Sequence, residues 1–215
     1  MAMSLFKIRA SAAGKIMTKV NDDALPATAK SYCKEWVDEV YYNKYKIINT
    51  NPIKKGIMCE QQAINLLGIH LDQFLFKNCD YLENDFCTGT YDTLTEDNGT
   101  VIDTKCIWSY DTFKKIKSPA MGYIFQLQAY MSLLGISKAK LAYIYIDTPV
   151  ALVDDEFHRN NKGLSYDDFL AMHRPIISDD ERIKIFDIER DDEIVTQLNA
   201  RVVQCRDYIK ELIAT

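Results

Sequence analysis

Two aspartates and a lysine stand at a spacing that could build a metal site. Asp103 and Lys105 are separated by one residue, and Asp92 precedes them in a stretch interrupted by Asn98 and Gly99. The Asn-Gly pair suits the two positive φ angles of a type I′ turn, so the stretch predicts a β-hairpin with this pair as its loop. In that register Asp92 faces Lys105, and the strand period of two puts both aspartates and the lysine on one face. We expect the two carboxylates to be diagonal neighbours, about 7–8 Å apart between backbones.

These three side chains would suit phosphate chemistry. Two acids on a partly buried face need a compensating cation, and Mg²⁺ takes oxygen ligands from carboxylates, waters and phosphate groups. The ion would lower the pKa of a bound water, and Lys105 would orient that water or balance the charge that develops on phosphorus. The alternative interpretation is a solvated hairpin whose charges alternate. An EF-hand calcium loop is excluded, because aligning Gly99 with the glycine of that loop puts Leu94 at the first ligand position and Lys105 at the last.

Helices and further strands must position the hairpin. The predicted elements are, in order, helices over 23–48 and 53–68, a strand over 74–82 that leads into the hairpin, a helix over 119–134, strands over 141–147 and 183–188, and a helix from Asp191. Glu60 lies near the buried edge of the second helix, where an acid is paired with a base, turned toward a cation, or simply at the surface. Gln126 and Tyr130 are four residues apart and share one face of the third helix.

The motifs resemble those of a known superfamily. Gly89-Thr-Tyr-Asp92, Val-Ile-Asp103-Thr-Lys105 and Gln126-Leu-Gln-Ala-Tyr130 are similar, in type and order, to the motifs of the PD-(D/E)xK nucleases. More narrowly, the chain resembles the YqaJ and lambda-exonuclease-type phage recombination exonucleases, which share a RecB-like QxxxY motif. The resemblance covers roughly Arg9 to Asp147. It implies a restriction-endonuclease-like α/β core, with a mixed central sheet and hairpin flanked by helices. The length and hydrophobic content of the chain separately predict a single domain over 1–215.

The resemblance also implies roles for individual residues. Asp92, Asp103, Lys105 and Glu60 would be catalytic, and the metal contacts would be Asp92, Asp103, Thr104 and Glu60. The metal would be Mg²⁺, for which Mn²⁺ can substitute. The residues expected to contact DNA are Arg9 and Ser11 in the N-terminal segment, Gln126 and Tyr130 of the QxxxY motif, and Lys114 and Lys115 in a basic, aromatic segment after the hairpin. On composition alone the N-terminal segment could be a first helix with a serine cap, and the basic segment a solvated loop.

The implied activity is that of a metal-dependent deoxyribonuclease. It would be a 5′–3′ exonuclease acting on the ends of duplex DNA during phage recombination, with a homotrimeric assembly and a single-strand annealing protein as partner. An endonuclease and a CRISPR-adaptation-type RecB-like nuclease are alternatives within the enzyme class. A DNA-binding module that has lost catalysis is the alternative from another class, and the intact set of Asp92, Asp103 and Lys105 counts against it.

The length, charge and cysteine content of the chain limit the kinds of core, surface and metal site that it can form. With 215 residues and 47% hydrophobic content, the chain can bury a full core. Its net charge of −5 argues against a surface coated with basic patches, although local lysines can still contact DNA. Six cysteines without a C-x-x-C pair and three scattered histidines give no zinc pattern, and Cys205 stands alone, so we expect no iron–sulfur cluster.

Two further expectations concern location and an ambiguous segment. No apolar run approaches the roughly 20 residues that span a bilayer and no signal-peptide core is present, which predicts a cytoplasmic protein without membrane contact. Residues 149–180 are polar, and they are predicted either to form a helix around Tyr166 to His173 with a loop near the substrate groove, or to be an exposed insertion.

Overall fold

The centre of the molecule is a four-stranded mixed sheet. The computed structural model describes residues 5–18, 24–161 and 163–214. The sheet has the order β4-β5-β6-β7, with β4 at Thr93–Leu94, β5 at Thr100–Cys106, β6 at Lys138–Ile144 and β7 at Ile183–Glu189. β5 pairs in parallel with β6, whereas the β4–β5 and β6–β7 pairs are antiparallel. The parallel pair requires a crossover, which α5 (Met121–Leu134) provides.

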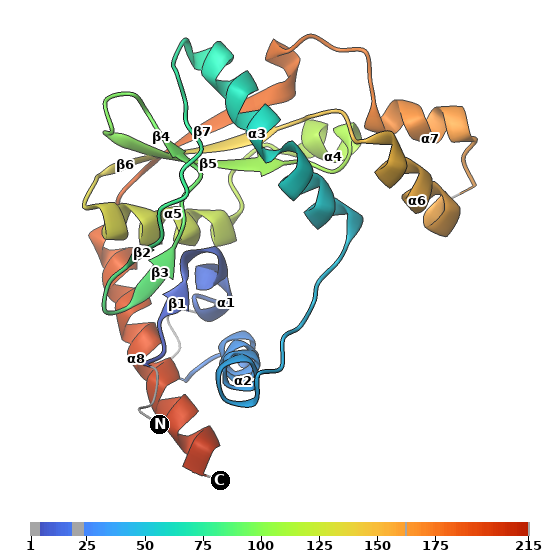
Figure 1. The fold of residues 1–215 in the computed structure, drawn as a ribbon. Helices are drawn as coiled ribbons and strands as arrows, with labels where there is room; N and C mark the ends of the chain where they lie inside the picture. Colours follow the sequence, from blue (N-terminus) through green and yellow to red (C-terminus); the bar gives the residue numbers. More distant parts are fainter. Residues whose placement is uncertain (1–4, 19–23, 162, 215) are drawn as a thin grey trace.

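Helices cover both faces of this sheet (Figure 1). On one face α3 (Asn51–Leu71) packs against the buried Ile102, Ala142 and Ile144. On the other face α5 packs against the alternate strand residues Val101 and Leu141 in the larger core. β6 is apolar from Leu141 to Ile144, as expected of a strand buried on both faces, whereas β5 carries Asp103, Thr104 and Lys105 after Val101 and Ile102. Every second residue of β5 therefore points toward α3 and the others toward α5.

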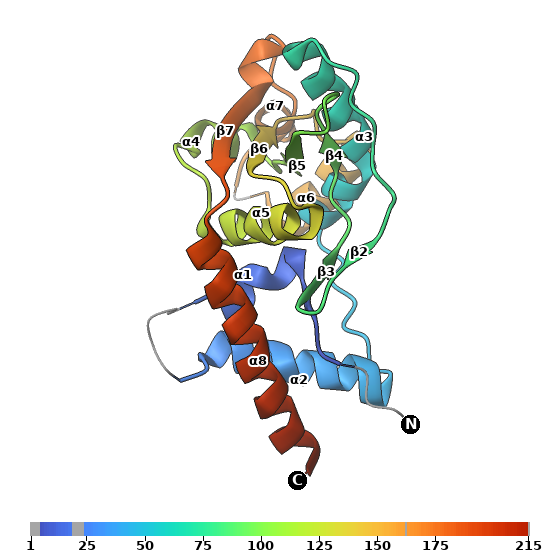
Figure 2. The ribbon, with the colours of Figure 1, turned by 90° about the vertical axis from the view of Figure 1, so that its left-hand side faces the viewer.

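The remaining helices extend the α5 side and the carboxyl end of the sheet. α8 runs beside α1 and α2, and Figure 2 shows these three helices together below α5. α6 and α7 pack on each other, and α7 also contacts α4. The bounds are α1 Ala13–Ile16, α2 Ala27–Tyr42, α4 Tyr110–Lys115, α6 Val150–Asn160, α7 Tyr166–His173 and α8 Asp192–Ala214, with short 3-10 turns η1 at Ala10–Ala12 and η2 at Asp180–Arg182. Among the described residues, no helix is long and apolar enough to cross a membrane.

Most predicted helices are confirmed with shifted ends. α2 stops at Tyr42 because Asn43 adopts a left-handed φ of 52°, and the start predicted at residue 23 lies outside the described residues. The helix predicted around Tyr166 to His173 is present as α7. The preceding residues form a further helix, α6, and the placement of a loop near the substrate groove stays a prediction.

The strand predicted over 74–82 was wrong. Only Leu82–Glu83 form a strand, β2, and it belongs to a second, three-stranded sheet of order β1-β3-β2 with β1 at Ile8–Arg9 and β3 at Cys87–Gly89. Phe74 and Phe76, which suggested a buried strand, are 80% and 78% exposed. Aromatic content favours a strand only where the side chains find a face to pack against, and here they do not.

The hairpin is present, but its predicted register was wrong. Thr93 pairs with Ile102 and the Thr95 N–H donates to the Thr100 carbonyl, so the loop has four residues instead of two. Only Asn98 of the predicted turn pair has a positive φ, 56°. The Asp97 carboxylate accepts hydrogen bonds from the Thr95 hydroxyl and the Gly99 N–H, which stabilises the longer loop. The shift amounts to two residues, and because side chains alternate with a period of two, each still points to its predicted face.

Candidate active site

A hollow of about 330 Å³ opens at the edge of β5, between α3 and α5. β4 pairs with β5 only as far as Ile102, so the β5 edge is free of a partner strand from Thr104 onward. Three elements supply the polar lining: Glu60 comes from α3, Asp92 precedes β4, and Thr104 and Lys105 come from β5. The apolar part of the lining includes Ile53, Ile57, Ile107 and Tyr123. The structure thus gathers Glu60, Asp92, Thr104 and Lys105 from segments far apart in the sequence.

Asp103 and Lys105 form a buried ion pair beside this hollow. Asp103 is 1% exposed, and its Oδ2 lies 2.6 Å from Lys105 Nζ. Burial raises the pKa of Asp103 to about 6, with Asp92 adding to the increase and Lys105 opposing it. Burial lowers the pKa of Lys105, but the charge of Asp103, the hydrogen bond to it and the charge of Asp92 together outweigh that effect, and the net pKa is raised. Both side chains are therefore charged at neutral pH, and the ammonium also lies 4.8 Å from the centre of the Tyr123 ring.

Asp92 is held by the free edge of β5. Its Oδ2 accepts hydrogen bonds from the Thr104 backbone N–H at 2.6 Å and from the Thr104 hydroxyl at 2.8 Å. The carboxylate thereby replaces the missing strand partner of Thr104. Burial raises the pKa of Asp92, while Lys105 and the two bonds from Thr104 oppose the increase. Since the N–H and C=O of one strand residue point to the same edge, the Thr104 carbonyl also faces the side of the hollow.

Gln126 and Tyr130 connect Asp103 to the segment that carries Asp92. Gln126 Nε2 donates to Asp103 Oδ1 at 2.9 Å and lies 3.3 Å from the Tyr130 hydroxyl, which donates to the Thr90 carbonyl at 2.8 Å. Both side chains are buried, and burial raises the pKa of Tyr130 to about 12. A Cβ at Gly89 would lie 2.8 Å from Tyr130 Cε1, so this position must be glycine for the ring to approach. The pair orders the site from inside, and its contact with DNA stays a prediction.

Glu60 lies at the outer side of the hollow, where its Oε2 is 2.6 Å from Lys77 Nζ. Glu60 is therefore paired with a base, one of the alternatives that the sequence left open, and its metal contact stays a prediction. Lys77 had no distinctive sequence context and was missed. Tyr123 was also missed, although it stands three residues before Gln126 on the same helix and so shares its face.

The donor set fits a hard divalent cation. Glu60, Asp92, Asp103 and the Thr104 carbonyl are all oxygen donors, the type that Mg²⁺ prefers. Among the described residues Asp103 Oδ2 makes an ion pair but no directed hydrogen bond, so this buried oxygen has a lone pair to offer. As they stand, no three acidic, histidine or cysteine side chains in the described ranges are grouped closely enough to hold an ion. The Glu60 carboxylate is paired with Lys77 and would have to leave that contact to reach an ion.

The predicted DNA contacts lie outside the hollow. The Arg9 guanidinium forms an ion pair with Glu39 of α2, beside a separate cavity of about 500 Å³, and Ser11 is exposed in η1. η1 packs against α5, which places this segment next to the helix of Gln126 and Tyr130. Lys114 and Lys115 are exposed in α4, where Lys114 pairs with Asp111 at 2.9 Å. These four residues do not join the cluster of acids.

No protein-family model matches the chain, and the search of curated proteins gave no match. Solved structures do match over nearly the full length. A phage-related exonuclease from Haemophilus somnus is 27% identical, with a TM-score of 0.82 over 98% of this chain and 96% of that one. An alkaline exonuclease from Laribacter hongkongensis is 20% identical, with a TM-score of 0.68 over 98% and 93%. Its complex with dAMP matches at 20% identity and a TM-score of 0.68, over 97% and 92%.

These likenesses confirm the predicted fold class. This chain has the α/β fold of the two exonucleases, and the resemblance to lambda-exonuclease-type nucleases, stated from three short motifs, extends over nearly all of it.

Proposed function

We propose that this protein is a Mg²⁺-dependent deoxyribonuclease that degrades duplex DNA from an end. The observation that carries the proposal is the buried pair of Asp103 and Lys105, set beside Asp92 and Glu60 at the free edge of a central strand. Burying a carboxylate and an ammonium has a large desolvation cost, which a purely structural site would avoid with apolar residues. The likeness to a phage-related exonuclease supports the exonuclease over an endonuclease or a binding module.

Each residue would have a separate task in phosphodiester hydrolysis. Mg²⁺, held by Asp92, Asp103, Glu60 and the Thr104 carbonyl, would supply Lewis-acid polarisation of the phosphate and a more acidic water. Lys105 carries a proton at neutral pH, so it would stabilise negative charge that develops on the phosphate instead of removing a proton. The hydrogen bond from Gln126 to Asp103 Oδ1 would fix the orientation of that carboxylate.

Cleavage of linear and circular duplexes tests this function. We expect the protein with Mg²⁺ to degrade linear duplex DNA, to leave a covalently closed circle of the same sequence intact, and to be inactive with a chelator. Mn²⁺ should restore activity after chelation. Cutting of the closed circle would instead indicate an endonuclease, and failure to cut either substrate would indicate a binding module.

The N-terminal segment makes a prediction about the DNA end. Arg9 offers a guanidinium and Ser11 a hydroxyl, a combination suited to a terminal phosphate. We expect a 5′-phosphorylated duplex to be degraded several-fold faster than the same duplex with a 5′-hydroxyl, and Arg9→Ala to remove most of that difference. Rates on the two substrates give the measurement. The matched control is Lys210→Ala, which removes one positive charge from an exposed pair with Asp207 on α8 and should keep the difference. Equal wild-type rates on both ends would refute end recognition while leaving the nuclease assignment intact.

Assembly and pathway remain predictions from the resemblance. A homotrimer would encircle the product and allow many cuts in one encounter, and a single-strand annealing protein would take up the strand that is left. Large apolar side chains are available for an assembly of this kind, since Ile69, Phe74 and Phe76 are between 78% and 80% exposed around the end of α3. Apolar side chains gathered on a surface in this way commonly mark an interface.

A further inference from the structure

Lys55 is a fully buried lysine that the proposed chemistry does not use. It lies in the second turn of α3 with 0% of its surface exposed. Its Nζ donates to the Ile107 carbonyl at 2.6 Å and to the Trp108 carbonyl at 3.1 Å, and it lies 4.4 Å from the centre of the Tyr145 ring. A lysine near the start of a helix ordinarily reaches solvent with its ammonium group. This one points inward, between α3 and the carboxyl end of β5.

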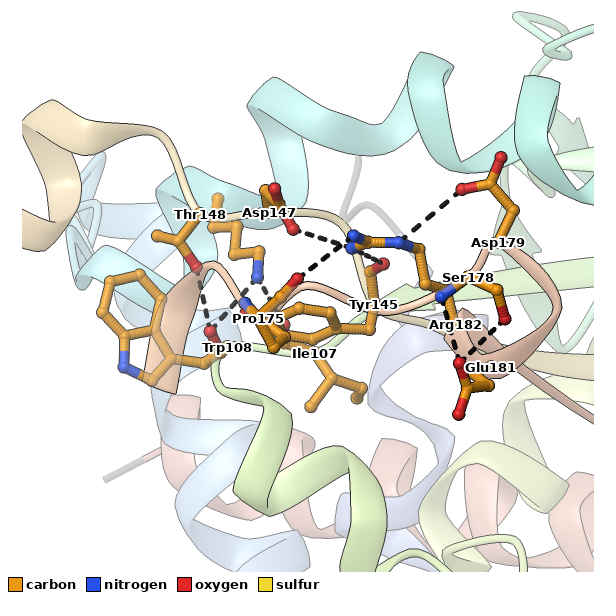
Figure 3. A network of polar contacts seen from close by, with 11 residues as sticks. Ile107, Trp108, Tyr145, Asp147, Thr148, Pro175, Ser178, Asp179, Glu181 and Arg182 are labelled. Atoms are coloured by element: carbon orange, nitrogen blue, oxygen red, sulfur yellow. Dashed lines mark hydrogen bonds and ion pairs between the residues drawn. The ribbon is translucent and has the colours of Figure 1, made fainter. Parts of the chain in front are cut away.

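The carbonyls that receive Lys55 belong to a polar network at the ends of β5 and β6, shown in Figure 3. The Trp108 carbonyl also accepts from the Thr148 hydroxyl at 3.1 Å and lies 3.2 Å from His173 Nδ1. Arg182 Nη1 holds the next part of the network, 2.7 Å from Asp147 and 3.5 Å from the Tyr145 carbonyl. The loop after β5 is therefore held in place by side chains from several other segments of the chain.

The position of Lys55 has an energetic cost. Among the described residues, Lys55 forms no ion pair within 4.0 Å, although Asp147 lies near enough to favour its charge. Burial lowers its pKa to about 8; Cys59, Cys106 and Asp147 oppose the decrease and Arg182 adds to it. An apolar side chain of the same length would fill this space without the desolvation cost. An apolar side chain could not, however, form the hydrogen bonds that Lys55 donates to the two carbonyls.

The two bonds from Lys55 connect α3 to the residues that follow β5, and each of these segments forms one wall of the hollow. Ile107 follows β5 directly and lines the hollow together with Lys105. Gly56, Ile57 and Glu60 form the α3 wall, and Glu60 follows Lys55 by five residues, about 7.5 Å along the helix axis. α3 packs on β5 through apolar contacts, and the two hydrogen bonds from Lys55 add directional links to defined carbonyls.

We infer that Lys55 is a positioning residue that sets α3 against the end of β5 and thereby places Glu60 for metal binding. The inference rests on the proposed function, because it gives Glu60 its role as a metal contact. Lys55 itself touches neither the hollow nor the substrate. Lys55 holds Glu60 at a constant distance from Asp92 and Asp103.

A double-mutant cycle with Mn²⁺ as the probe tests the inference. Affinities are measured by calorimetry, without DNA, on the wild type, Lys55→Met, Glu60→Gln and the double variant, each below its melting temperature. We expect each single variant to weaken Mn²⁺ binding by about 10-fold, and the double variant to bind no more weakly than Glu60→Gln alone. A general loss of stability would lower affinity by the same factor in both backgrounds. Where Lys55→Met fails to fold, Lys55→Gln serves instead, since it also loses the charge and the reach to both carbonyls.

Lys184 provides the matched control. It is also a lysine that donates to backbone carbonyls, those of Phe113, Lys114 and Ile116, and it lies over the Phe113 ring, but it caps α4 instead of joining the walls of the hollow. Lys184→Met should leave Mn²⁺ affinity unchanged. Wild-type affinity in Lys55→Met, or additive losses in the double variant, would each overturn the inference while the metal assignment survives. An unchanged affinity in Glu60→Gln would overturn the inference and also remove Glu60 from the proposed metal contacts, leaving Asp92 and Asp103. Absence of Mn²⁺ binding by the wild type would overturn both.

Discussion

Asp103→Asn is expected to lower the rate of DNA cleavage by on the order of 1,000-fold or more, while DNA binding persists. The substitution removes one negative charge from the metal site and leaves the outer surface of the protein unchanged. Asparagine is preferable to alanine here, because the side chain is 1% exposed and fills space beside Gln126. Single-turnover cleavage of a linear duplex measures the rate, and gel-shift titration measures binding.

The same variant has a predictable effect on stability. Asp103→Asn leaves Lys105, which is 21% exposed, with Asp92 as its remaining acidic neighbour, so we expect a destabilisation below the roughly 3–5 kcal/mol that is typical of breaking a fully buried ion pair. Urea denaturation of Asp103→Asn, and of Asp103→Asn combined with Lys105→Met, separates the effect of the lysine charge from the other effects of the substitution. The double variant removes that charge and should recover much of the lost free energy of unfolding. Cleavage by Asp103→Asn near the wild-type rate would remove Asp103 from the active site.

Lys105→Met is expected to reduce turnover by on the order of 100-fold to 1,000-fold while Mn²⁺ still binds. The ammonium competes with a metal ion for the negative charge of Asp103, 2.6 Å away, so its removal should leave metal affinity unchanged or slightly higher. The variant loses the cation that would stabilise the phosphate in the transition state. Turnover measured at saturating DNA, together with calorimetric titration of Mn²⁺, provides the two readouts.

Asp103→Asn and Lys105→Met thus give opposite results in the metal titration, with loss expected in the first and retention in the second. Loss of Mn²⁺ binding in Lys105→Met would make that lysine a structural support of Asp103 instead of a catalytic group. Lys140→Met is a suitable control, because Lys140 also pairs with an aspartate, Asp187, but at the exposed surface of the sheet.

The common face of the candidate site residues could be predicted from the sequence although the hairpin register could not. Loop length depends on which side chains cap the turn, and Asp97 capped a four-residue loop where Asn98 and Gly99 alone suggest two. The resulting shift of two residues preserves which side chains share a face. A shift of one residue would have separated Asp92 from Asp103, so the prediction depended on the period of the strand more than on the turn.

Burial was harder to predict than helix or strand type. Phe74 and Phe76 look like core residues and are exposed, whereas Lys55 looks like a surface residue and is buried. A signal for Lys55 exists in hindsight, since Lys55, Cys59 and Ala63 recur every four residues along the stripe of α3 that packs on the sheet. A charged residue on such a stripe is informative, but the carbonyls that satisfy it come from residues more than fifty positions away.

The short β4 strand has a consequence for solubility. A free strand edge can recruit a strand from another molecule, and natural proteins commonly block such edges with charged side chains. Here the N–H of Thr104 is occupied by Asp92, so the carboxylate that we propose as a metal contact also closes the free edge of β5. Substitutions that remove this carboxylate would therefore open a site for edge-to-edge aggregation as well as removing the proposed metal contact.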